Sequence, residues 1–170
     1  MSKRALKKYL GELDKDALQE QLMDLYDRFP EVKTYYDFVF SPNEEKLLKE
    51  ATGRIAEEYF PQRRKRAKAR RSVAQKYIKH FRTLGVDPQV LAEVMAFNLE
   101  TALRFERHKR CPEAFFRSMY KSYVEWGNHL VHNGLFREHL SRVKTFTNSV
   151  QVAGWPNREV FADYFDQLNT

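Results

Sequence analysis

Three side chains near the end of one expected helix have the residue types and the spacing of metal ligands. Glu125, His129 and His132 stand at i, i+4 and i+7, which places them on one helical face. Neither the His-Glu-x-x-His pattern of zinc proteases nor the Glu-x-x-His pattern of di-iron bundles occurs. The helix dipole also favours histidine near a helix C-terminus. We therefore expect capping or packing roles here, and we assign no metal or other cofactor.

The single cysteine, Cys111, is the other group that could carry chemistry. It follows His108-Lys109-Arg110 and precedes Pro112 at an expected helix start, and both features can lower a thiol pKa. However, no catalytic signature accompanies it, and a lone cysteine usually packs as a small hydrophobic residue. Glycine-rich phosphate loops and the G-x-S-x-G motif are also missing from the sequence. We therefore predict no catalytic residues and a non-enzymatic protein.

The positive charge of the chain is concentrated in residues 61–84. This segment holds ten of the 30 Lys and Arg residues and no acid, so it supplies the whole net charge of +7. A basic block of this kind is typical of proteins that bind nucleic acid, an anionic membrane or an acidic protein. The predicted polyanion contacts are Arg63, Arg64, Lys65, Arg66, Lys68, Lys76 and Lys79.

We predict that the basic segment is one long helix. Pro61 suits a first helical turn, and Gly85 suits the position after the last one. The lysines lie opposite an apolar stripe, whereas Arg70 and Arg71 flank it, where a carboxylate can bind a guanidinium through two hydrogen bonds. We therefore expect Arg70 or Arg71 to form a structural ion pair with a neighbouring helix, and the lysines to form an open surface.

The rest of the chain also has helical periodicity and capping residues. Short connections and an apolar content of 42% predict a single all-α domain of eight or nine antiparallel helices, as a bundle or a short array of helical pairs. Its parts are an acidic half (1–60), the basic helix (61–84) and charge-neutral, aromatic-rich helices (85–170). A short helix is expected over residues 31–40. The other expected helix starts are Ser2, Asp14, the capping box Ser41-Pro42-Asn43-Glu44, Asp87-Pro88, Cys111-Pro112, residue 135 and Asn157.

The acidic residues have a structural explanation in the sequence. Many stand four residues before a base, a spacing worth ~0.2–0.5 kcal/mol per pair on an exposed helix. These expected pairs are Asp24/Arg28, Glu45/Lys49, Glu50/Arg54, Glu100/Arg104, Glu106/Arg110 and Glu113/Arg117. They therefore give no reason to assign acid–base catalysis.

Three stretches of the chain resemble a known family. They are MSKRALKKYLGELDKDALQEQLMDLYDRFPEVKTYYDFVF, EEYFP and KARRSVAQKYIKHF. They are similar to a family of uncharacterised bacterial proteins that carries only a domain-of-unknown-function label, most strongly over residues 1–90. The resemblance implies a bacterial, stand-alone cytosolic protein. It implies no activity and no site residues.

Two functions remain open from the sequence. The first is a binding protein that docks residues 62–82 on a polyanion, with nucleic-acid backbone as the preferred partner and an acidic protein as another. The second is a protein–protein interaction scaffold whose basic face is merely solvated. A single cysteine and the lack of a long apolar segment lead us to expect a cytoplasmic protein without a membrane span. The sequence indicates neither an oligomeric state nor a small-molecule ligand.

Overall fold

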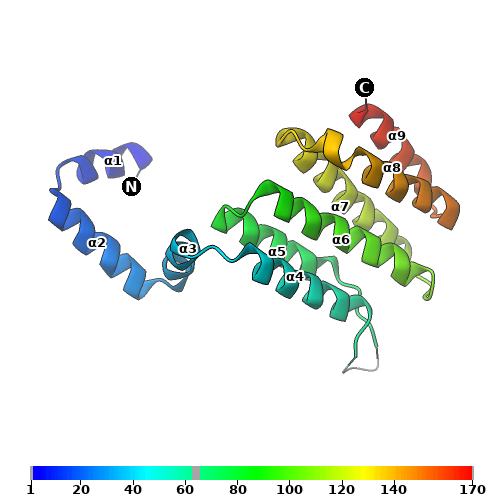
Figure 1. Ribbon diagram of the computed structural model, residues 1–170, viewed down its shortest axis with the longest axis horizontal. Helices are drawn as coiled ribbons and strands as arrows, with labels where there is room; N and C mark the ends of the chain where they lie inside the picture. Colours follow the sequence, from blue (N-terminus) through cyan, green and yellow to red (C-terminus); the bar gives the residue numbers. More distant parts are fainter. Residues whose placement is uncertain (1, 63–65, 170) are drawn as a thin grey trace. The chain divides into compact units, whose positions relative to one another are not determined.

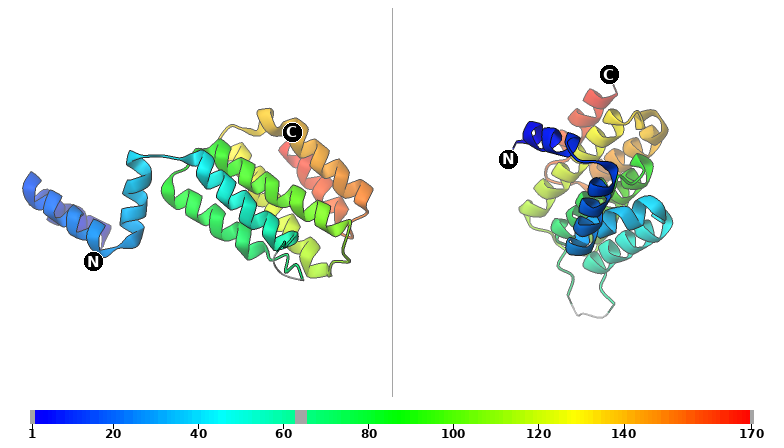
Figure 2. Two further views of the ribbon diagram at one scale, coloured as in Figure 1. Left: turned by 60° about the horizontal axis from the view of Figure 1, so that its bottom comes forward. Right: turned by 90° about the vertical axis from the view of Figure 1, so that its left-hand side faces the viewer.

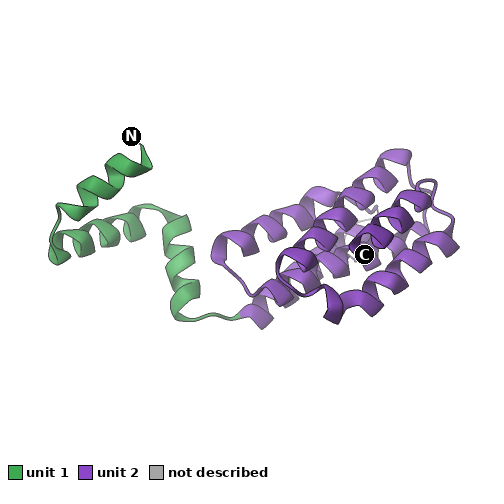
Figure 3. Cartoon of the chain, turned by 90° about the horizontal axis from the view of Figure 1, so that it is seen from above, with its two compact units in different colours: residues 1–43 green, residues 44–170 purple. Residues whose placement is uncertain are grey.

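The computed structural model describes residues 2–62 and 66–169, and these residues are mostly helical (Figure 1). They form nine α-helices and no strand, which confirms the all-α prediction. The chain divides into two compact units, residues 1–43 and 44–170 (Figure 3). The sequence predicted one domain because it has no Gly/Ser-rich linker at this boundary. Each unit is described by itself.

Unit 1 contains three helices, and the starts of the first two were predicted from their capping residues. The Ser2 side chain accepts a hydrogen bond from the amide of Ala5 at 3.2 Å. The Asp14 carboxylate accepts one from the amide of Ala17 at 2.8 Å. Both caps confirm the prediction, and no residue of these helices is buried. The helices are α1 (Lys3–Gly11), α2 (Lys15–Arg28) and α3 (Pro30–Phe40).

Unit 2 contains six helices arranged around α6. Helix α6 packs on α4, α5, α7 and α8, and α7 packs in turn on α8 and α9 (Figure 2). The predicted cap of α6 is present, since the Asp87 carboxylate accepts a hydrogen bond from the amide of Gln89 at 2.7 Å. The helices are α4 (Glu44–Tyr59), α5 (Arg71–Leu84), α6 (Pro88–Glu106), α7 (Glu113–His132), α8 (Phe136–Ala153) and α9 (Arg158–Leu168).

Aromatic side chains fill the core between α7, α8 and α9. The rings of Tyr123 and Phe161 are 5.0 Å apart, and those of Trp155 and Phe161 are 5.6 Å apart. Trp126, Trp155, Tyr123 and Phe161 are all almost completely buried. Such rings bury large apolar areas and favour tilted contacts of this kind. The aromatic content of the C-terminal half therefore serves the core.

One predicted helix start is wrong, and one residue at a correctly predicted start does not cap its helix. Ser41 does not start a helix, because it is the C-cap of α3 and α4 begins only at Glu44. Asn157 precedes α9, but its side chain forms no capping hydrogen bond. Instead its amide donates to the carbonyl oxygen of Phe116 at 3.1 Å. Ser41 ends the preceding helix, and Asn157 contacts a different helix. In both cases this contact replaces the local capping bond that the sequence pattern favoured.

The prediction of one continuous basic helix is also wrong. Helix α5 begins at Arg71, and residues 66–70 are not helical. Ala69 has a φ of 47°, a left-handed value that no α-helix contains. Three of the predicted contacts, Arg63, Arg64 and Lys65, lie outside the described residues.

Candidate nucleic-acid interface

Glu58, in the last turn of α4, fixes the place where α5 begins. Its backbone oxygen accepts hydrogen bonds from the amides of Lys68 and Ala69, both at 3.3 Å. Its carboxylate accepts one from the Arg70 amide at 3.2 Å and two from the Arg70 guanidinium at 2.9 and 3.3 Å. The two bonds to the guanidinium, together with the negative charge of the Glu58 carboxylate, raise the pKa of Arg70. A helix running on from Pro61 would give up this arrangement, which explains the shorter helix.

A second carboxylate, Glu125 of α7, binds the side of α5 that faces it. Its two oxygens accept hydrogen bonds from Arg71 at 2.9 Å, Gln75 at 2.7 Å and Arg82 at 3.1 Å. Arg71 also donates to the hydroxyl of Ser122 at 2.8 Å. The Glu125 side chain is only 21% exposed. This half-buried carboxylate is therefore shared by two guanidinium groups, and it fastens α5 to α7.

Three arginines of the basic segment, Arg70, Arg71 and Arg82, thus serve the fold. The sequence suggested an ion pair for Arg70 or Arg71, and each of them has one, to Glu58 and Glu125 respectively. Arg82 pairs with Glu125 as well, and sequence reasoning missed this contact. The sequence does contain a pattern that indicates this contact, because Arg71, Gln75 and Arg82 stand at i, i+4 and i+11 and therefore share one helical face.

The remaining described cations of the segment face solvent. Lys76 and Lys79 are exposed on α5, and Arg66 and Lys68 are exposed in the stretch before it. None of these four side chains forms an ion pair with a described residue. We call them the exposed cation set. They are the part of the predicted contact surface that the structure describes.

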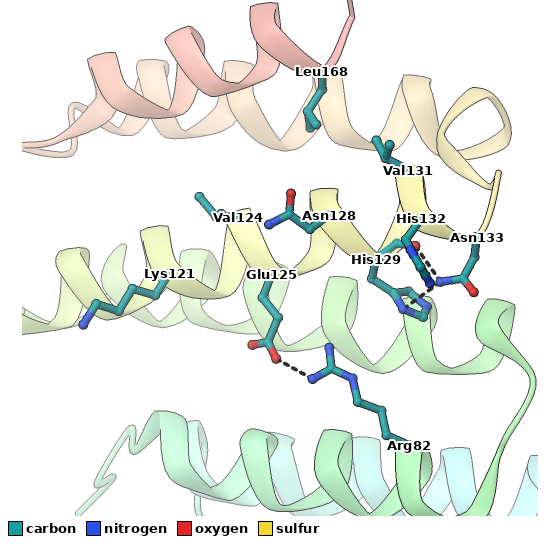
Figure 4. A pocket seen from close by; sticks show the side chains of 10 residues that line it. All are labelled: Arg82, Lys121, Val124, Glu125, Asn128, His129, Val131, His132, Asn133 and Leu168. Carbon is teal, nitrogen blue, oxygen red and sulfur yellow. Dashed lines mark hydrogen bonds and ion pairs between the residues drawn. The ribbon is translucent and has the colours of Figure 1, made fainter.

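Two hollows flank α5, and their charges differ. The hollow on the α4 side has a volume of about 770 Å³, and its charged lining is balanced. It contains three carboxylates (Glu50, Glu57, Glu58) and three cations (Arg54, Arg70 and Lys76 of the exposed cation set). The hollow on the α7 side has a volume of about 780 Å³ (Figure 4). Its only carboxylate is Glu125, which Arg71 and Arg82 already neutralise. The α7 side is therefore the more favourable one for an anionic ligand.

The predicted ligand face on α7 lies in this second hollow. His129 bonds the carbonyl oxygen of Pro88 through Nε2 at 2.8 Å, so that nitrogen carries the proton. Its Nδ1 then accepts from the Asn133 amide at 3.2 Å. Glu125 is held by α5, as described above. In the described part of the chain, no group of three or more His, Cys, Asp or Glu residues could hold a metal.

Cys111 is a half-buried thiol next to an acidic residue. Its Sγ lies 3.3 Å from the carbonyl oxygen of Lys109. Burial, with a smaller effect from the Glu106 carboxylate, raises its pKa to about 11. The lower pKa suggested by its basic sequence neighbours does not occur. The structure therefore gives no physical basis for an activated nucleophile at Cys111.

The predicted pairs of acids and bases divide into local and tertiary contacts. Asp24–Arg28 and Glu113–Arg117 form the expected pairs at 2.8 and 2.7 Å. Glu100 of α6 instead accepts hydrogen bonds from Arg142 of α8, at 2.6 and 3.1 Å. These acids have structural partners, as the sequence suggested, although Glu100 finds its partner on another helix.

Comparison with known proteins assigns the chain to a family. The model of a family of unknown function, DUF6155, matches residues 1–169, so the chain belongs to this family. No curated protein and no solved structure matches it. Within the described residues, every helix is too short or too polar to cross a membrane.

Proposed function

We propose that residues 44–170 bind the phosphate backbone of a nucleic acid through the exposed cation set. The observation that carries the proposal is the division of labour within the basic segment. Its arginines Arg70, Arg71 and Arg82 are held by the protein's own carboxylates. Lys76 and Lys79 of the same helix are exposed and have no ion-pair partner among the described residues. Their charge is available to an external anion.

The charge balance of the units supports the same partner. Residues 44–170 contain 23 basic and 15 acidic residues, whereas residues 1–43 contain seven and eight. Lysine ammonium groups act as compact point charges that suit phosphate oxygens. Binding of this kind is independent of base sequence and releases counterions. Four phosphate contacts would give a slope of log Kobs against log [salt] of roughly −3 to −4.

The experiment is a binding titration over a salt series. Fluorescence anisotropy with labelled DNA should show affinity that falls steeply with salt, with a slope near the value above. The double variant Lys76→Glu/Lys79→Glu should abolish binding and keep the helical circular dichroism. The double variant Arg137→Glu/Lys144→Glu, on exposed positions of α8, changes the net charge equally and should weaken binding much less. Affinity independent of salt, or equal losses in the two variants, would overturn the proposal.

A protein interaction scaffold is the second candidate, and unit 1 favours it. No residue within α1, α2 or α3 is buried. Their apolar side chains, such as Met23 at 57% exposure and Phe40 at 79%, are therefore available to a partner. A pull-down that returns one stoichiometric protein, and not an acidic contaminant removed by salt, would favour this function. A bacterial, cytoplasmic setting, which the family resemblance implied, is part of both proposals.

A further inference from the structure

The hollow beside α5 has the features of a binding groove for a flat, acceptor-rich group. Its floor is α7, with Arg82 of α5 on one side and Leu168 of α9 on the other (Figure 4). A volume of about 780 Å³ lies within the range of small-ligand sites. The groove touches the proposed interface directly, because Arg82 lies one helical turn from Lys79 of the exposed cation set.

The polar groups of this groove are mainly donors. The Asn128 side-chain oxygen accepts a hydrogen bond from Tyr164 at 3.0 Å, which leaves the amide nitrogen to donate. Lys121 adds an ammonium group on the same helix. The one carboxylate, Glu125, has both oxygens occupied by Arg71, Gln75 and Arg82. A ligand in this groove would therefore present acceptors.

Apolar and flat surface lies next to the donors, toward the C-terminal end of α7 (Figure 4). Val131 is 52% exposed, and Leu168 stands opposite it on α9. The exposed imidazole of His132 lies on the same face of α7. Histidine is one of the side chains on which unpaired bases stack. Nucleobases combine a flat apolar face with carbonyl and ring-nitrogen acceptors at the edge, and they match this combination.

We infer that the nucleic acid is single-stranded and that one of its bases lies in the groove on α7. This inference rests on the proposed function, since the exposed cation set would hold the neighbouring phosphates. In a duplex the bases are paired and stacked inside, so none can reach a groove beside the phosphate-binding helix. In a single strand a base can turn out of the backbone track and enter it.

The test compares three probes on the full chain at one salt concentration. They are an oligothymidylate of about 20 nucleotides, an abasic strand of the same length and a duplex of the same length. The oligothymidylate should bind about tenfold more tightly than the abasic strand, since only it supplies a base. Equal binding of the oligothymidylate and the abasic strand overturns the inference but keeps the proposed function. Binding of none of the probes overturns both.

Variants locate the base within the groove. Asn128→Leu removes the donor without changing the charge, and Tyr164 keeps its second acceptor, the Val124 carbonyl oxygen at 3.1 Å. It should reduce oligothymidylate binding about three- to tenfold and leave abasic binding unchanged. Val131→Asp should reduce oligothymidylate binding more strongly than Asn128→Leu, because it places a carboxylate in the groove. Val152→Asp adds the same charge at a valine that is 87% exposed on α8 and should have little effect. Equal effects of the two aspartate variants would overturn the assignment.

Discussion

Gly127 of α7 lies so close to Tyr164 of α9 that there is no room for a side chain. A Cβ atom at Gly127 would be 2.7 Å from the Tyr164 ring and 2.7 Å from Leu168. Gly127→Ala should therefore push the Tyr164 ring and the Leu168 side chain away from α7, and it should lower the free energy of unfolding by about 1–3 kcal/mol despite the better helix propensity of alanine. Chemical denaturation followed by circular dichroism measures this.

Gly53 provides the matched control for that variant. It lies inside α4, and a Cβ atom there would meet nothing within 4 Å. Gly53→Ala should raise the free energy of unfolding by about 0.5–1 kcal/mol, because alanine is favoured in a helix interior. If both variants shift the free energy of unfolding in the same direction, Gly127 is not required for the close packing of α9 on α7.

The shared carboxylate of Glu125 should contribute more than an exposed ion pair. Glu125→Ala leaves Arg71 and Gln75 without their acceptor at a half-buried site and should cost about 2 kcal/mol. Glu113→Ala removes an acid from the exposed pair with Arg117 and should cost less than about 1 kcal/mol. Equal losses in thermal or urea unfolding would contradict a special role for Glu125.

Glu58 is expected to hold the start of α5. Glu58→Ala removes the acceptor of the Arg70 amide and guanidinium and should cost about 1–2 kcal/mol. Hydrogen exchange should then accelerate first at the amides of residues 68–73. Acceleration confined to α4 would mean that the carboxylate does not position the following segment.

His139 makes the stability of the protein sensitive to acid. The residue is buried, and Nε2 bonds the side-chain oxygen of Gln89 at 2.9 Å. Burial lowers its pKa below the ordinary 6.5, so between these two values the unfolded chain binds more protons than the folded one. Stability should therefore fall as the pH drops below about 6.5, by at most ~1.4 kcal/mol per pH unit from this group. His139→Gln should flatten that part of the curve of unfolding free energy against pH.

Cys111 should react slowly with alkylating reagents. Its pKa of about 11, against an ordinary 9.0, leaves roughly a hundredfold less thiolate near pH 8. The rate of iodoacetamide labelling, measured by mass spectrometry, should rise by about that factor when the chain is unfolded in urea. A folded protein that labels as fast as the unfolded one would exclude the raised pKa.

The helices themselves could be predicted from the sequence because their signals are local. Ser2, Asp14 and Asp87 cap the helices that follow them, since a side-chain oxygen and a nearby amide are enough to define the motif. Ser41 and Asn157 have the same chemistry, but Ser41 ends the preceding helix and the Asn157 side chain does not cap α9. Their side chains lie where another helix end or another element competes for them, and the local pattern contains no information on that.

The site was only partly predictable for a related reason. The excess of charge in residues 61–84 is a property of composition, so the sequence identified it directly. Which cations remain exposed depends on acids far away in the chain. Glu58 and Glu125 form ion pairs with Arg70, Arg71 and Arg82, and so remove these arginines from the exposed set. The paired residues are far apart in sequence, by 54 residues for Arg71 and Glu125. The groove on α7 depends on Leu168 of α9 in the same way, and no local spacing indicates it.

The division between bound arginines and exposed lysines on α5 has a practical consequence. Reagents that acylate amines attack ammonium side chains and do not attack guanidinium groups. Mild acylation would therefore erase the positive potential that α5 offers to its surroundings, while Arg71 and Arg82 continue to hold the helix in place. On this helix the charge that supports the architecture and the charge that meets other molecules can be separated by a simple chemical reagent.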